Sequence, residues 1–253
     1  MNVTGDVLPL TGERTVPGIA AENYWFRRHE AAYRFAAGFV AGHEVLEIGC
    51  GEGYGTAQLS SVATRILGID YDATTITHAA GTYPQVAFAR ANLAALPVTT
   101  RRVHSVVALQ VIEHVWNHPE FVRECLRVLR PGGLLLVTTP NRLTFSPGLD
   151  TPVNPFHTKE FTADELVDLV SGCGFDVTHV LGLHAGVRLE RLDGKHGGSF
   201  VGAQLAAPPQ QWSAQLRGDV AAVRAEDFPI VAADVHDVNE SLDLVVLARR
   251  PAG

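Results

Sequence analysis

The chain has 253 residues, of which 46% are hydrophobic, and this is enough apolar material for one large core. Its formal net charge is −7 and no run of Lys or Arg exceeds a pair, so nothing indicates a partner that is a nucleic acid. The 3 cysteines (Cys50, Cys125 and Cys173) form no C-x-x-C pair, which argues against a disulfide scaffold or a zinc site and favours a reducing compartment.

We expect neither a targeting sequence nor a membrane segment. Residues 1–17 are polar and interrupted by Gly and Pro, unlike a signal peptide. No apolar run approaches the roughly 20 residues that a membrane-spanning helix needs. The sequence therefore predicts a cytoplasmic protein that does not bind membranes.

The chain should begin with a loop and then a helix that acts as a lid. Residues 1–20 look like a loop, and residues 22–41 read as a helix that carries aromatic and basic side chains. Most of the aromatic residues are expected to pack on a sheet. Tyr24, Arg28 and His29 are the candidates for contact with a ligand.

From residue 43 onward, predicted strands and helices alternate at short intervals, which indicates a doubly wound, mostly parallel α/β sheet of seven strands. The last strand has no helix after it, so we expect it to be antiparallel and part of an edge hairpin. The predicted strands cover residues 44–48, 65–69, 86–89, 103–109, 134–139, 176–182 and 242–249, and the predicted helices cover 55–61, 73–81, 117–129 and 161–172.

We interpret residues 1–253 as a single domain in four parts. They are an N-terminal lid and helix (1–42), a cofactor-binding core (43–185), an insertion (186–240) and the last strand (241–253). The insertion could be a substrate cap or a contact between subunits.

A glycine stretch follows the first predicted strand. Gly occupies every second position from Gly49 to Gly55, which predicts a tight turn where the backbone comes close to a ligand. The dinucleotide fingerprint G-x-G-x-x-G fails in both registers, because its third Gly would fall on Tyr54 or Thr56. Glu47 precedes the turn, and an anion there suits a cationic ligand better than a pyrophosphate.

Two further signals follow the next two predicted strands. Asp70 comes roughly 20 residues after the glycines, where a carboxylate accepts hydrogen bonds from ribose hydroxyls. Asp70 could instead cap the next helix, but Asp72 is better placed to do so. Asn92 and Leu93 follow the third strand, and the side-chain oxygen of Asn92 can accept a hydrogen bond.

Glu113 and His114 follow the fourth predicted strand, where the reacting group should lie. A carboxylate next to an imidazole can act as a base and its orienting group, or as ligands of a cation. His157 lies in a proline-containing loop after the fifth strand and so should reach the same edge of the sheet. The alternatives are a polar helix start for Glu113 and His114, and helix capping or packing for His157.

Together these signals resemble the class I S-adenosylmethionine-dependent methyltransferases, whose first motif is E/D-x-G-x-G-x-G. The resemblance covers residues 45–140 and includes the run Gln110-Val111-Ile112-Glu113-His114-Val115. It implies a Rossmann-like fold and S-adenosylmethionine as cofactor. Family members usually carry Asp at the place of Asn92. The implied cofactor contacts are Tyr24, Glu47, Gly49, Gly51, Tyr54, Asp70, Tyr71, Asn92, Leu93 and Gln110.

The quinone-type O-methyltransferases of this family hold Mg²⁺ with an E-x-x-E-H run. Glu113 and His114 match that run, whereas Gln110 departs from it by losing one charge. The resemblance thus implies Mg²⁺, with Glu113, His114 and His157 as its ligands and as the catalytic residues.

A narrower resemblance is to the sugar O-methyltransferases of mycobacterial methylmannose polysaccharide biosynthesis. Residues 1–48, 145–148, 154–158 and 195–199 carry it. It implies a homodimer that methylates a hydroxyl of a short mannoside, the 1-hydroxyl of a 3-O-methylated mannose. The alternatives are a phenolic, quinone or lipid acceptor, or a cofactor-binding sensor without transferase activity. The acidic charge balance argues against an RNA methyltransferase.

Overall fold

The structure, a computed structural model, describes residues 15–253, so most of the loop expected at the N-terminus lies outside the described residues. Its sheet has eight strands in the order β3-β2-β1-β4-β5-β8-β6-β7. The bounds are β1 Glu44–Ile48, β2 Arg65–Asp70, β3 Ala87–Arg90, β4 Val103–Leu109, β5 Leu129–Pro140, β6 Asp176–Leu183, β7 Ile230–Ala232 and β8 Asp243–Arg249.

Strands β1 to β5 pair with one another in parallel, whereas β8 runs antiparallel to both β5 and β6. The doubly wound, mostly parallel sheet and the antiparallel last strand are therefore confirmed. The strand order reverses between β1 and β4, and the crevice at such a reversal is where open α/β sheets bind ligands.

Two details of the predicted sheet were wrong. The last strand is not at an edge, because β8 inserts between β5 and β6. The sheet also has an eighth strand, β7, which pairs antiparallel with β6 and comes from the insertion. Three residues are too few to show an alternating pattern, so β7 could not be recognised from sequence.

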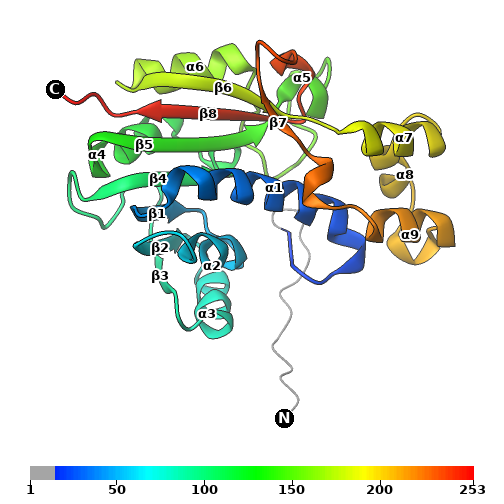
Figure 1. Cartoon of the computed structure of the whole chain (residues 1–253), viewed down its shortest axis with the longest axis horizontal. Coiled ribbons are helices and arrows are strands. Elements are labelled where there is room, and N and C mark those ends of the chain that lie inside the picture. Colours follow the sequence, from blue (N-terminus) through cyan, green and yellow to red (C-terminus); the bar gives the residue numbers. More distant parts are fainter. Residues whose placement is uncertain (1–14) are drawn as a thin grey trace.

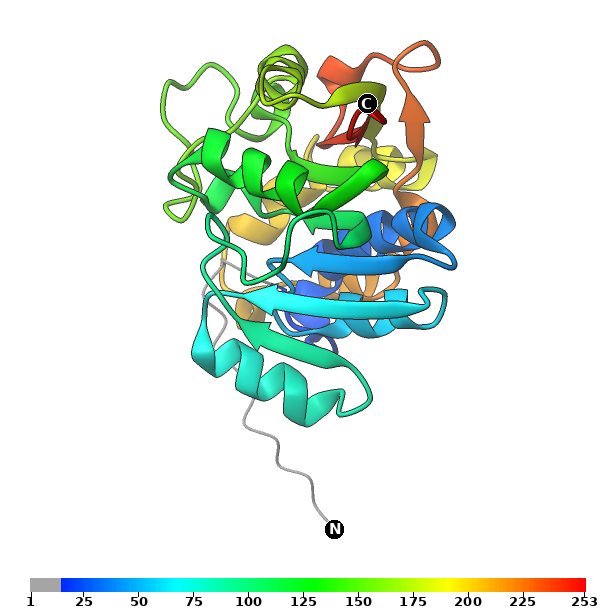
Figure 2. The same ribbon diagram turned by 90° about the vertical axis from the view of Figure 1, so that its left-hand side faces the viewer.

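Helices cover both faces of the sheet, as Figures 1 and 2 show. One face packs on α1, α2 and the insertion, and the other on α4 and α6. Within residues 15–253, none of the helices is both long and apolar enough to cross a membrane. The bounds are α1 Asn23–Val40, α2 Tyr54–Ser60, α3 Ala73–Thr82, α4 His118–Val128, α5 Arg142–Phe145, α6 Ala163–Gly172, α7 Val187–Lys195, α8 Phe200–Leu205 and α9 Ala214–Ala221.

The insertion packs against α1, and none of its residues lines the main cavity of the described chain. Helices α7, α8 and α9 gather beside the start of α1 (Figure 1). Phe200 and Phe228 of the insertion contact Tyr24 edge-to-face, with ring centroids 5.9 and 5.2 Å away. These aromatic contacts hold the insertion against the lid helix, and its role as a substrate cap or a contact between subunits stays a prediction.

A buried ion pair joins α1 to β8. Nε of Arg28 donates to Oδ2 of Asp243 at 2.7 Å, and Nη2 donates to the other carboxylate oxygen and to the carbonyl of Leu242. The two side chains are only 6% and 3% exposed. A buried pair of this kind is costly to break, because the remaining charge is left without a partner in a low-dielectric site.

We therefore predict that Arg28→Ala and Asp243→Ala each lower the free energy of unfolding by about 3–5 kcal/mol. Urea denaturation measures this. The control is Arg34→Ala on the same helix, because Arg34 makes its ion pairs at the surface. This change should lower the free energy of unfolding by at most about 1 kcal/mol. An Arg28→Ala protein as stable as the control would contradict the structural role of the pair.

Candidate active site

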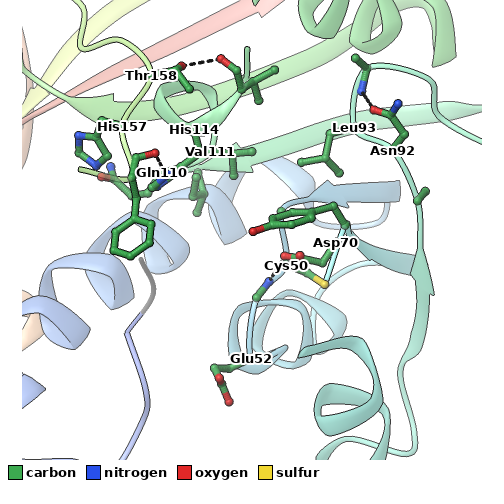
Figure 3. Close-up of a pocket in the computed structure, with 18 of the residues that line it drawn as sticks. Cys50, Glu52, Asp70, Asn92, Leu93, Gln110, Val111, His114, His157 and Thr158 are labelled. Atoms are coloured by element: carbon green, nitrogen blue, oxygen red, sulfur yellow. Dashed lines mark hydrogen bonds between the residues drawn. The ribbon is translucent and has the colours of Figure 1, made fainter. Parts of the chain in front are cut away.

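The main cavity lies at the carboxyl ends of the central strands and has a volume of about 1050 Å³. Single ligand sites usually span about 300–1,000 Å³, so this cavity has room for a cofactor and an acceptor. Figure 3 shows its two ends, with Cys50 and Asp70 on one side and His114 and His157 on the other. Of the residues predicted to bind a ligand, the lining includes His29, Gly49, Gly51, Tyr54, Asp70, Tyr71, Asn92, Leu93, Gln110, His114 and His157.

The glycine turn between β1 and α2 depends on the absence of side chains. Gly49 has φ 72°, and a Cβ there would lie 2.4 Å from Cγ2 of Val111. At Gly55 a Cβ would lie 1.9 Å from Cζ of Tyr33, which packs across α2. The alternating glycines therefore let the turn approach β4 and let α1 approach α2, and together these contacts shape the cofactor end of the cavity.

Glu47 is buried directly before the turn. The hydroxyl of Tyr33 donates to its Oε1 at 2.6 Å, whereas Oε2 has no hydrogen-bond partner among the described residues. Burial raises the pKa of this carboxyl to about 7, although the hydroxyls of Thr56 and Tyr33 act in the other direction. An orphaned buried carboxylate oxygen would be compensated by a nearby cation, which fits a cofactor that carries an ammonium and a sulfonium.

Asp70 lines the same end of the cavity. Its Oδ2 accepts a hydrogen bond from the amide of Gly51, and its Oδ1 accepts one from the amide of Asp72, both at 3.0 Å. These bonds orient the carboxylate, and each oxygen keeps a second lone pair for a ribose hydroxyl. Asp72 caps α3 by accepting from the amide of Thr75 at 2.7 Å, as we expected. Tyr71 is 53% exposed beside them and offers an aromatic face.

Asn92 lines the cavity, but its oxygen is already engaged. Oδ1 accepts a hydrogen bond from the amide of Ala94 at 2.9 Å, which closes an Asx turn (Figure 3). An adenine amino group would have to share this oxygen. Leu93, the next residue, adds an apolar contact on the same wall.

The opposite end of the cavity is formed by the segment after β4 and the loop before α6. The amide of Thr158 donates to the carbonyl of Glu113 at 2.6 Å, and its hydroxyl oxygen lies 3.0 Å from the same carbonyl oxygen. Nδ1 of His114 donates to the carbonyl of Phe156 at 3.0 Å. These bonds hold the two segments together, and the rings of His114 and His157 meet edge-to-face with centroids 4.9 Å apart.

Two predicted residues at this end have engaged side chains. Gln110 has φ 56°, an uncommon conformation for a residue other than Gly, and its Nε2 donates to Oγ1 of Thr138 at 3.1 Å. Glu113 is 1% exposed and does not line the cavity. Its Oε2 accepts from the hydroxyl of Thr139 at 2.9 Å, and burial raises its pKa to about 8.

His157 forms a buried dyad with Glu160, which the sequence analysis did not identify. Nδ1 of His157 lies 2.8 Å from Oε1 of Glu160, and the two side chains are 4% and 1% exposed. If Nδ1 carries the proton, Nε2 presents its lone pair, and Nδ2 of Asn154 is 3.1 Å from it. Burial lowers the pKa of His157, so the imidazole is neutral near pH 7. A neutral imidazole oriented by a carboxylate is suited to accept a proton.

Glu113, His114 and His157 can also present one ligand atom each within 4.8 Å of one another. This is the one group of three or more such residues among residues 15–253. The structure thus brings together the three residues predicted as catalytic and metal-binding. One carboxylate and two imidazoles could hold a divalent cation.

Of the three candidates for ligand contact on the lid helix, only His29 lines the cavity. Tyr24 is 3% exposed in the hydrophobic core and does not line the cavity, which corrects its prediction as a cofactor contact. Arg28 is engaged with Asp243. His29 does line the cavity, where its Nδ1 lies 3.2 Å from the hydroxyls of both Thr15 and Tyr54.

Other residues of the lining were missed, among them Thr15, Trp116 and Phe156. Trp116 lies two residues after His114 and Phe156 directly precedes His157, so proximity in sequence to the predicted residues was the available signal. Asn141, directly after β5, does not line the cavity, because its side-chain amide donates to the carbonyls of Val238, Asn239 and Ser241 and fixes the backbone.

We predict that Glu47→Gln changes how stability depends on pH. The folded-state pKa of about 7 exceeds the ordinary value of 4.5, so between these values the folded state binds more protons, and this group's contribution to stability falls as pH rises. Glutamine cannot ionise. In urea denaturation, the free energy of unfolding of Glu47→Gln should therefore rise relative to that of the wild type by on the order of 1–3 kcal/mol between pH 5 and pH 8. Glu190→Gln, on an exposed position of α7, is the control. Parallel curves for wild type and Glu47→Gln would contradict a carboxyl pKa raised by burial.

Comparisons with known proteins agree with this geometry. A model of the methyltransferase domain matches residues 46–137. A probable S-adenosylmethionine-dependent methyltransferase of Mycolicibacterium smegmatis is 53% identical over 252 residues, covering 99% of this chain and 98% of the relative. A ubiquinone biosynthesis O-methyltransferase of Methylobacterium is 35% identical over 115 residues, covering 41% of this chain and 43% of the relative.

Solved structures show the same fold. A methyltransferase of Thermotoga maritima, described as a possible histamine N-methyltransferase, superposes with a TM-score of 0.61 and 17% identity over 92% of this chain and 96% of that one. The family follows from the near full-length match to the mycobacterial relative, together with a glycine turn, Asp70 and a cavity at the reversal of strand order. The chain belongs to the class I S-adenosylmethionine-dependent methyltransferases.

Proposed function

We propose that this methyltransferase acts on a hydroxyl of a short mannoside, the 1-hydroxyl of a 3-O-methylated mannose unit, during methylmannose polysaccharide biosynthesis. The observation that carries an O-methyltransferase is the His157–Glu160 dyad on the cavity that also holds the glycine turn and Asp70. A hydroxyl is a weak nucleophile, so its methylation requires a base or a cation, and the acceptor end of the cavity can supply either.

In the first form of the proposal His157 is the base. The acceptor oxygen forms a bond to the methyl carbon, the carbon–sulfur bond breaks, and its electron pair stays on sulfur, which becomes a thioether. The hydroxyl proton passes to Nε2 of His157, while Glu160 holds Nδ1. The acceptor hydroxyl would replace the amide of Asn154 at Nε2. The methyl group is activated by the sulfonium, so the chain mainly positions the reactants and removes this proton.

In the second form a divalent cation is held by Glu113, His114 and His157. When bound, a cation lowers the pKa of a coordinated hydroxyl. Mg²⁺ prefers oxygen ligands, whereas two imidazoles and a carboxylate suit Mn²⁺ or Zn²⁺ better. This donor set gives little support to the Mg²⁺ expected from sequence. Nε2 of His157 cannot serve a cation and a proton at once, so removing metal distinguishes the two forms.

The polarity of the acceptor end supports a sugar. His114, Asn117, His157 and Thr158 line it, and each can exchange hydrogen bonds with hydroxyls. A homodimer belongs to the proposal as well, and light scattering coupled to gel filtration tests it.

A second candidate is an O-methyltransferase for a phenolic or quinone acceptor. The partial match to a ubiquinone biosynthesis O-methyltransferase favours it, and so do the aromatic side chains of Trp116 and Phe156 at the cavity. A phenol needs less help from a base than an alcohol, because its hydroxyl is already the stronger acid.

We predict that label from the methyl group of S-adenosylmethionine passes to 3-O-methylated mannosides and not to phenols or quinols. The assay incubates the protein with equal concentrations of each acceptor and counts label in the separated products. Unmethylated mannosides are the matched control for the 3-O-methyl group. Faster labelling of a phenol than of any mannoside would support the second candidate and contradict the first.

We predict that His157→Ala lowers turnover by about 10²–10⁴-fold, the usual contribution of a general base, and leaves the affinity for S-adenosylmethionine within about threefold. Glu113→Ala should show the same division between turnover and cofactor affinity. Calorimetric titration measures the affinity. His179→Ala, an exposed histidine on β6, is the control. Equal losses in turnover and cofactor affinity would show that these residues have a structural role and not a catalytic one.

If a cation contributes, exhaustive treatment with EDTA should lower turnover at least about tenfold, and Mn²⁺ should restore it better than Mg²⁺. We expect this loss, because Glu113, His114 and His157 can each present a ligand atom within 4.8 Å of one another. Turnover that is unchanged after chelation would remove the cation from the proposal and leave His157 as the base.

A further inference from the structure

We infer that Trp116 binds the second sugar unit of the acceptor by stacking, so the enzyme prefers an oligosaccharide to a single sugar as its substrate. This inference rests on the proposed function and extends it to the length of the acceptor. Trp116 is 88% exposed, more than any other large apolar side chain in the described part of the chain. It nevertheless lines the cavity that contains His114 and His157.

The backbone on both sides of Trp116 is fixed. The carbonyl of Val115 accepts a hydrogen bond from the hydroxyl of Thr158 at 2.6 Å, and the side chain of Asn117 caps α4 by accepting from the amide of Glu120 at 3.2 Å. The exposed indole is thus carried by a segment whose backbone is fixed, and it does not lie at the tip of a long loop. A large aromatic side chain exposed beside a cavity usually marks a binding surface.

Phe156 provides a second aromatic side chain at the opening, or mouth, of this cavity. It is 41% exposed, lines the cavity, and its carbonyl accepts the hydrogen bond from His114. This hydrogen bond holds the backbone of Phe156 beside His114. Trp116 and Phe156 therefore lie on the two segments that form the acceptor end, one on each.

The occupant that fits this mouth is a sugar chain. A pyranose has an apolar face of C–H groups and a rim of hydroxyls. An indole can cover the face while Asn117, Thr158 and water satisfy the rim. A lipid would leave these polar groups unpaired. When one sugar unit lies at His157 inside the cavity, the next sugar of the oligosaccharide extends to the exposed indole at the opening of the cavity.

The test compares Trp116→Ala with Trp116→Phe on 3-O-methylmannose and on the corresponding α-linked disaccharide. Trp116→Ala should raise KM for the disaccharide about tenfold and leave kcat, and KM for the monosaccharide, within about twofold. Trp116→Phe keeps an aromatic face and should stay within about threefold of wild type. Disaccharide should also change the tryptophan fluorescence of the wild type and not that of Trp116→Ala. Circular dichroism checks that the variants fold.

Equal effects on both acceptors, or none on either, would overturn the stacking role and leave mannoside methylation intact. Dissociation of a dimer by Trp116→Ala would assign the indole to a subunit contact and overturn the inference as well. If the wild type methylates no mannoside of any length, the proposed function itself fails, and this outcome is distinct from the others.

Discussion

The buried ion pair between Arg28 and Asp243 is the constraint on which the site most depends. It fixes α1 to β8, two elements that are far apart in sequence, and thereby sets the position of the helix that brings His29 and Tyr33 to the cavity. His29, the next residue, contacts Tyr54 at the glycine turn, so the same helix closes the cofactor end. The insertion strengthens this arrangement, because its aromatic residues pack around Tyr24, which lies one helical turn before Arg28 on α1.

The two ends of the cavity are built by different means. The cofactor end depends on missing side chains, since Gly49 and Gly55 allow the close approach of Val111 and Tyr33. The acceptor end depends on hydrogen bonds between segments, because Thr158 attaches one loop to the carbonyl of Glu113. Cofactor binding is consequently a property of the fold, whereas the choice of acceptor is a property of the loops.

Much of the fold and the cofactor end could be predicted from the sequence, because local rules govern them. Glycine spacing, the helix cap at Asp72 and the alternation of strands and helices all act within a few residues. Tyr24 could not be predicted, because its role is set by contacts across the fold, and Glu160 could not be predicted, because its pairing depends on the conformation of an irregular loop. An aromatic residue on a lid helix can face the ligand or the core, and only the packing of the insertion directs Tyr24 to the core. Glu160 becomes an orienting group only because the loop turns Nδ1 of His157 toward it.

The central claim is that the methyl group passes from sulfur to a sugar oxygen at the acceptor end. The most direct measurement is NMR of the product formed from 3-O-methylated mannosides and cofactor labelled with ¹³C in its methyl group. The account predicts a labelled methoxy carbon whose protons correlate with the anomeric carbon, C1. Label on any other position, or a mannoside that remains unlabelled while the cofactor binds, would contradict it.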